Sequence, residues 1–219
     1  MLERFVNGRN KSNAYVFARS DGRALLVDAG VGAATKVVDL VRAERLDPLA
    51  LFLTHGHPDH IWTARQLADR YDIPAYVHLN DLPWFFDPAS GKTIPAVRKV
   101  GSALARLKRL RPARLRAISD QATIGAGPFR VSVLHAPGHS RGSVCLRVDD
   151  LCFVGDTVFR DAVGHGAFPG GSTASLRNSI KRVLLPLPDD VRILPGHGEE
   201  TLVGAERKRW VDYTSDRGA

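Results

Sequence analysis

Four side chains that can bind a metal ion fall within six consecutive positions of this 219-residue chain, directly after an apolar run. The run, residues 49–53, predicts a buried strand, and the segment after it reads Thr54-His55-Gly56-His57-Pro58-Asp59-His60. Glycine and proline disfavour a regular helical turn here, so the imidazoles and the carboxylate should crowd together at the carboxyl end of the strand. Zinc, iron and manganese bind such groups. A metal site is therefore the favoured interpretation, with a surface His/Asp cluster that binds no ion as the alternative.

Three later segments repeat this arrangement. Each places a histidine or an aspartate among small or turn-forming residues after an apolar run: Gly138-His139-Ser140, Gly155-Asp156-Thr157 and Pro195-Gly196-His197-Gly198. The candidate ligands at predicted strand ends are then His55, His57, Asp59, His60, His139, Asp156 and His197. Because a zinc ion in proteins usually takes about four ligands, this set suits two metal ions better than one.

These motifs, in this order, resemble those of the metallo-β-lactamase superfamily, and most closely those of its short glyoxalase-II-type hydrolases. The resemblance runs from about residue 13 to residue 201. It implies an α/β (α+β) fold built as a four-layer αββα sandwich. The chain is 44% hydrophobic, so residues 1–219 are enough to form this sandwich as a single domain.

The resemblance also implies a role for each ligand. One ion would be held by His55, His57 and His139, the second by Asp59, His60 and His197, and Asp156 would bridge the two. The implied cofactors are two divalent metal ions, with zinc first and iron or manganese as alternatives. Asp59 would also take part in catalysis, by accepting a hydrogen bond from the attacking hydroxide.

Asp28 ends another predicted strand, residues 24–28, in the sequence Asp28-Ala29-Gly30. The family has a similar Asp-x-Gly at this place, which implies that the Asp28 carboxylate supports the ligand histidines. A carboxylate near a ligand histidine fixes its tautomer and raises its basicity. The alternative is an aspartate that forms a turn or caps a helix.

Four side chains are candidates for the wall of a substrate pocket, which is typically apolar and aromatic. Trp84 lies in the aromatic-rich segment 79–86, where a covered core position is the alternative, and His78 just before it is more simply a structural histidine. His165 and Phe168 lie in the Gly-rich loop 159–172, where an exposed loop histidine is the alternative for His165. This loop ends in Phe-Pro-Gly-Gly, as in short glyoxalase-II proteins. Their usual Gly-Arg-Thr-Asp is replaced by Gly-His-Gly-Ala, which leaves the substrate open.

Composition restricts the environment and the partners. The chain has no apolar stretch long enough to cross a membrane and no signal-peptide layout at its N-terminus, so a soluble, cytoplasmic protein is predicted. Cys145 and Cys152 flank a predicted hairpin turn and are expected to be buried, reduced thiols rather than a disulfide. The formal charge of +8 favours anionic partners. The basic segment 92–116 predicts a solvated amphipathic helix over 95–110, with an anion-attracting or nucleic-acid-binding rim as the alternative.

The predicted activity is hydrolysis of a small acyl substrate by a hydroxide that bridges two metal ions, with a thioester as the first candidate. A lactone is the second candidate substrate, and the charge balance would suit an anionic one. The runner-up activity is that of a mononuclear iron persulfide dioxygenase. Cleavage of nucleic acid is less favoured, because the chain shows no recognisable RNA-clamping arm. The sequence does not predict the oligomeric state.

Overall fold

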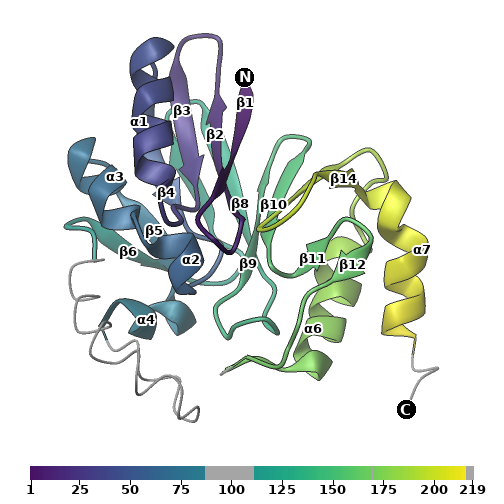
Figure 1. The fold of residues 1–219 in the computed structure, drawn as a ribbon. Coiled ribbons are helices and arrows are strands. Elements are labelled where there is room, and N and C mark those ends of the chain that lie inside the picture. The colour runs from purple at the N-terminus through teal and green to yellow at the C-terminus, as the bar shows by residue number, and fades with distance from the viewer. Residues whose placement is uncertain (87–110, 169, 216–219) are drawn as a thin grey trace.

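Two six-stranded sheets pack face to face in the computed structural model, which describes residues 1–86, 111–168 and 170–215 (Figure 1). The first sheet runs in the order β1 (Leu2–Asn7), β2 (Ser12–Ala18), β3 (Arg23–Val27), β4 (Asp47–Phe52), β5 (Ala75–His78) and β6 (Leu115–Ile118). The second runs in the order β14 (Thr201–Leu202), β13 (Arg192–Pro195), β10 (Leu151–Gly155), β9 (Val144–Val148), β8 (Phe129–His135) and β7 (Thr123–Ala126). Both sheets are mixed, since β3 to β6 are parallel in the first and β10 and β13 are parallel in the second.

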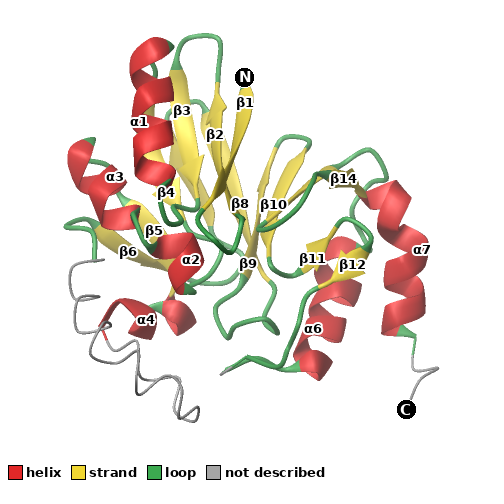
Figure 2. Cartoon of the chain, in the orientation of Figure 1, coloured by secondary structure: helices red, strands yellow, loops and turns green. Residues whose placement is uncertain are grey.

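Helices cover the outer face of each sheet (Figure 2). The first sheet is covered by α1 (Ala33–Ala43) and α3 (Ala64–Arg70), which follows the short α2 (Pro58–Ile61). The second is covered by α6 (Thr173–Ser179), which continues as a π-helical turn η3 (Ile180–Leu184), and by α7 (Val203–Thr214). Short elements complete the chain: η1 (Leu79–Asp81), α4 (Pro83–Phe86) and the small hairpin of β11 (Val158–Phe159) and β12 (Ala162–Val163). Among the described residues no helix is long and apolar enough to cross a membrane.

Three separate apolar cores lie between these four layers. Alternation along the strands creates them: Leu25 and Val27 of β3 point between the sheets, whereas Leu26 points toward α1 and α3. On the far side, the second sheet packs on α6, η3 and α7 through buried residues that include Trp210. The predicted αββα sandwich is therefore confirmed. Both cysteines are free and buried, as expected.

Residues 58–70 form two helices rather than one continuous helix, because the backbone between them bonds to another segment. The Thr63 amide and its hydroxyl both donate to the Ala29 carbonyl, at 2.8 and 3.1 Å, and the Ala29 amide donates to the His60 carbonyl at 2.7 Å. The β11–β12 hairpin lies at the start of the Gly-rich loop 159–172, and neither this hairpin nor strand β1 was expected from the sequence. The predicted helix 95–110 and most of the basic segment 92–116 lie outside the described residues.

One end of the sandwich brings together loops from both sheets. The Val144 amide donates to the Thr54 carbonyl at 2.9 Å, the Asn13 amide to the Gly196 carbonyl at 2.7 Å, and the Gly196 amide to the Gly155 carbonyl at 2.7 Å. These backbone bonds tie the chain after β4 to β9, and the chain after β13 to both β2 and β10. All the predicted metal-binding segments therefore meet at this end.

Candidate metal centre

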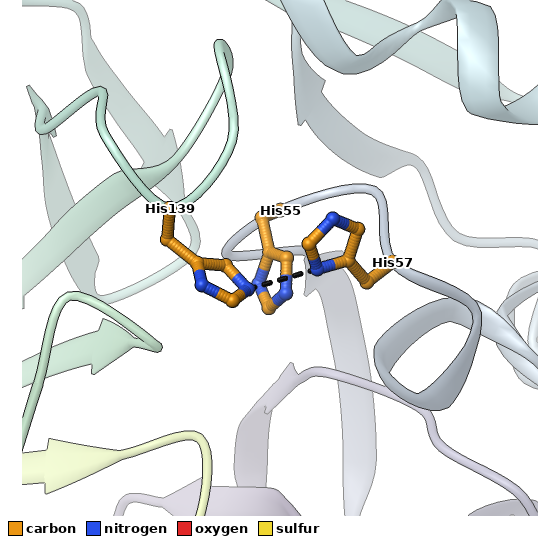
Figure 3. Close-up of side chains that lie close together, drawn as sticks. All are labelled: His55, His57 and His139. Carbon is orange, nitrogen blue, oxygen red and sulfur yellow. Dashed lines mark hydrogen bonds between the residues drawn. The ribbon is translucent and has the colours of Figure 1, made fainter. Parts of the chain in front are cut away.

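The first group of candidate ligands consists of His55 and His57, from the loop after β4, and His139, from the loop between β8 and β9. One ring nitrogen from each lies within 4.8 Å of the others. Figure 3 shows the three rings gathered together, with His57 Nδ1 and His139 Nε2 separated by 2.8 Å. His139 Nδ1 donates to the His165 carbonyl at 3.1 Å, which leaves the lone pair of His139 on Nε2. The Nε2 atom of His55 is buried and has no hydrogen-bond partner among the described residues.

The second group consists of Asp59 and His60, in the first turn of α2, and His197, after β13. His60 Nδ1 donates to Asp28 at 2.9 Å, and His197 Nδ1 donates to the Asn10 carbonyl at 3.1 Å. In its neutral form each ring therefore carries its lone pair on Nε2, and these two Nε2 atoms face each other at 3.2 Å. Two lone pairs would repel at this distance, so the position fits a cation, either a proton or a metal ion.

Asp156, which follows β10, lies between the two groups. Its Oδ2 is 3.4 Å from His139 Nε2 in the first group and 3.4 Å from His197 Nε2 in the second. Its Oδ1 is 3.5 Å from His60 Nε2 and is buried without a hydrogen-bond partner in the described part of the chain. Unpaired buried polar atoms are costly, and cations would satisfy them. The seven side chains thus fit two divalent cations that share Asp156.

Glycines allow these loops to approach so closely. A Cβ atom at position 196 would overlap Asp156, and one at position 155 would lie 2.7 Å from the Thr54 hydroxyl. Gly155 also has a φ of 51°, which glycine adopts without strain. The small residues beside His197 and Asp156 are therefore needed for the geometry of the centre.

The first group is held neutral in the absence of an ion. Burial and the neighbouring His60 and His57 keep the pKa of His55 well below its usual value. Burial and His139 lower the pKa of His57 to about 3. Burial also lowers the pKa of His139, against the opposing effect of Asp156. These nitrogens are therefore available to a metal ion at neutral pH.

The second group binds a proton instead. Burial lowers the pKa of His60, but Asp156 and Asp28 outweigh it and raise the pKa to about 9. Burial likewise opposes protonation of His197, but its hydrogen bond to Asp156 raises the pKa overall. The Asp156 pKa is lowered despite burial, chiefly because of His60 and His197. An ion entering this group must therefore displace a proton.

Asp28 is buried directly behind the second group and makes the expected contact with a ligand histidine. Its carboxylate accepts from His60 Nδ1 at 2.9 Å, from the Thr54 amide at 2.8 Å and from the Thr54 hydroxyl at 2.8 Å. That hydroxyl also lies 3.1 Å from His55 Nδ1, from which it can accept. Asp28 thus fixes the His60 tautomer directly and that of His55 through Thr54.

Two of the predicted pocket residues flank the first group. The Trp84 ring is 5.1 Å from the His57 ring, and the half-exposed Phe168 ring is 5.4 Å from His57 and 5.2 Å from His139. A Cβ atom at Gly56 would overlap the Trp84 indole, so the indole lies directly on this glycine. The His165 side chain is exposed, and the residue contributes its carbonyl to His139. The two aromatic rings form an apolar edge beside the centre.

His78 was a candidate for the pocket wall but more simply a structural histidine, and its side chain lies in a separate cluster with Asp120 and His135. The His78 ring stacks on His135 at 4.1 Å, and its Nε2 donates to Asp120 at 2.8 Å. Its Nδ1 accepts from the Asn80 amide at 3.3 Å, which fixes the proton on Nε2. The nitrogen that faces Asp120 therefore has no lone pair for an ion. His78 has a structural role, although these three side chains have the spacing of a metal site.

Two residues that support the centre were missed in the sequence. The buried Asp81 carboxylate accepts from the Gly56 amide at 2.8 Å, the Ser140 hydroxyl at 2.6 Å and the Gly142 amide at 2.8 Å, and so ties together the loops of His57 and His139. Asn10, between β1 and β2, donates to Asp59 Oδ2 at 3.3 Å while its carbonyl holds His197. Asp81 comes shortly after the apolar residues of β5, and this was the one signal of its role in the sequence. Asn10 holds His197 through its backbone carbonyl, so its residue type gave no signal of this role.

Curated proteins of several bacteria are similar to this chain. An uncharacterized protein of Mycobacterium tuberculosis is 38% identical over 217 residues, covering 95% of each chain. The probable metallo-hydrolase YqgX of Bacillus subtilis is 35% identical over 204 residues, covering 91% of each. The hydroxyacylglutathione hydrolase GloC of Haemophilus influenzae is 27% identical, covering 90% of this chain and 91% of its own.

Solved structures agree with these relatives. The BLEG-1 B3 metallo-β-lactamase superposes with a TM-score of 0.80 at 30% identity, covering 95% of this chain and 97% of its own. TTHA1623 in a di-iron-bound form superposes with a TM-score of 0.75 at 32% identity, covering 94% and 97%. The family model of the metallo-β-lactamase superfamily matches residues 7–197. A match of this extent, on this fold, shows that the chain belongs to the metallo-β-lactamase superfamily.

Proposed function

We propose that this metal-dependent hydrolase of the superfamily cleaves a small acyl substrate, and that the substrate is a thioester. The observation that carries the proposal is the pair of ligand groups that share Asp156, since a two-ion centre is suited to activating water. The similarity to GloC, which is named a hydroxyacylglutathione hydrolase, supports a thioester before a lactone. The similarity to YqgX, named a probable metallo-hydrolase, supports the reaction class.

The residues at and beside the metal centre would have separate roles in this reaction. Two divalent ions, when bound, lower the pKa of a shared water toward neutrality and polarise a substrate carbonyl. Asp59 is the more exposed carboxylate, at 24% against 10% for Asp156, and Asn10 orients it, so it is placed to accept a hydrogen bond from the attacking water. Trp84 and Phe168 offer apolar surface for the acyl group.

We propose zinc as the metal, with iron and manganese as the alternatives. The ligand set of five imidazoles and two carboxylates suits all three ions. The similarity to TTHA1623, which was solved in a di-iron-bound form, supports iron as an alternative.

Metal content and thioester hydrolysis, measured on one preparation, test the proposal. We expect about two ions per chain, as at two-metal hydrolytic sites, and hydrolysis that a chelator abolishes. His57→Ala should lower both metal content and activity, whereas Asp39→Ala, which alters an exposed residue of α1, should leave both unchanged. One iron per chain with no hydrolysis would refute the proposal and support the persulfide dioxygenase.

A further inference from the structure

A cavity of about 500 Å³ lies beside the loop that carries His139. Its polar lining comes mainly from Asn80, His135, Arg141, Ser172 and Ser175. No carboxylate is among the described residues that line it. Its volume is within the range of cavities that bind small molecules, about 300–1,000 Å³. A polar cavity with one cationic side chain and no carboxylate suits an anion.

The backbone at Arg141 is fixed in place. The Arg141 carbonyl accepts from His135 Nε2 at 2.9 Å and from Asn80 Nδ2 at 3.4 Å. The next amide, of Gly142, donates to the buried Asp81 at 2.8 Å. The base of the arginine is therefore preorganised, which reduces the entropic cost of binding a ligand there.

The guanidinium of Arg141, by contrast, has no hydrogen bond or ion pair within residues 1–86, 111–168 and 170–215. The carboxylates of Asp149 and Asp161 are paired with other arginines. The side chain is exposed, so its charge is accessible to a ligand that enters from solvent. An exposed guanidinium without a partner among the described residues presents several N–H donors, which suit a carboxylate or a phosphate.

The cavity and the metal centre share one wall. The Arg141 side chain runs along Gly170, where an added Cβ atom would lie 3.6 Å from Arg141 Cγ. Gly171 donates to the Phe168 carbonyl at 2.7 Å, closing the turn whose Phe168 ring contacts His57 and His139. Phe168 lies against the ligand histidines and Gly170, two residues later, lies along Arg141, so one short stretch of chain borders both the metal centre and the cavity.

We propose that this cavity binds an anionic group on the thiol half of the substrate, and that Arg141 makes the chain select anionic thioesters over neutral ones. The inference rests on the proposed function, because it assigns the second half of the same substrate. A carboxylate and a phosphate share the required chemistry. The acyl half, which binds at the metal centre, does not contact Arg141 in this arrangement.

Two thioesters with the same acyl group test the proposal on the metal-loaded protein. S-acetylglutathione carries carboxylates on its thiol half, whereas S-acetyl-N-acetylcysteamine is neutral. We expect Arg141→Gln to lower the ratio of kcat/KM for the anionic over the neutral thioester about tenfold, the usual effect of losing one charge-assisted hydrogen bond. Arg141→Lys should lose less, because it keeps the charge but not the fork. Acetyl coenzyme A, compared in the same way, distinguishes a phosphate from a carboxylate.

Arg130→Gln is the matched control, since Arg130 is an exposed arginine at the opposite end of β8. An unchanged ratio in Arg141→Gln, or an equal fall in Arg130→Gln, would overturn the proposal. If the wild type hydrolyses no thioester, the proposed function has failed. Calorimetry with the non-hydrolysable S-methylglutathione then tests, independently of hydrolysis, whether the cavity binds an anionic thiol half. Binding that Arg141→Gln weakens about tenfold supports the site. No binding to the wild type refutes it.

Discussion

Asp28→Asn changes one charge behind the second ligand group and almost nothing else. Asp28 has a φ of 58°, a conformation that asparagine also tolerates, so the backbone should not resist the substitution. The amide oxygen can still accept from Thr54, but the amide nitrogen cannot accept from His60 Nδ1. His60 would then be free to move its proton to Nε2, the atom that faces His197 at 3.2 Å.

The size of the effect follows from this loss. Removing the partner that orients a ligand histidine typically weakens metal binding about 10–100-fold, or roughly 1.4–2.8 kcal/mol. The ion held by Asp59, His60 and His197 should bear this loss. The ion held by the first group should lose less, because Asp28 reaches His55 only through Thr54.

Calorimetric titration of the metal-free protein with zinc measures both ions separately. Asp39→Asn, which makes the same change of charge at an exposed site on α1, serves as the control. Circular dichroism verifies that each variant is folded. If Asp28→Asn binds the second ion as tightly as the wild type, Asp28 does not set the His60 tautomer and the reasoning fails.

Three further predictions concern pH and the apolar edge of the centre. The metal-free protein should lose stability as pH rises from 6.5, the unfolded value, to about 9, because the pKa of His60 and that of His197 are raised on folding and their proton is lost in this window. Thermal unfolding across that range measures it, and a constant Tm would contradict it. Gly56→Ala should force the Trp84 indole aside and lower the free energy of unfolding by about 1–3 kcal/mol in urea titrations, so a wild-type value would mean that the indole moves freely. Phe168→Ala should raise KM while changing stability by less than about 0.5 kcal/mol, since the ring is 50% exposed, and an unchanged KM would remove it from the pocket.

The candidate ligands could be located in the sequence because each follows an apolar run within a few positions. His55, Asp156 and His197 each follow a buried strand closely, so a local pattern was enough to place them at a strand end. The contacts of Asp81 and Asn10 join segments far apart in the chain, and no local pattern encodes them. The residues that could bind an ion were therefore predictable, whereas most of those that hold them in place were not.

The fold shows the same division between local and distant causes. The αββα sandwich was expected from the family resemblance, and it agrees with strands such as β3, whose continuous apolar run packs on an apolar layer at each face. The break between α2 and α3 depends on the Ala29 carbonyl, which captures the Thr63 amide from another segment. A helical pattern in the sequence cannot reveal such competition, because the competing group is remote along the chain.

Each ligand group draws on both sheets, because His139 and His197 come from the second sheet and the others come from the first. An ion bound to either group would cross-link the sheets, so its binding free energy would also favour their docking. A ribosome that has completed only the first sheet, through residue 118, has produced neither full group. Because both ions would share Asp156, metal capture during synthesis would wait for residue 156 for one ion and for residue 197 for the other. Uptake of metal would then mark the end of folding in the cell rather than its beginning.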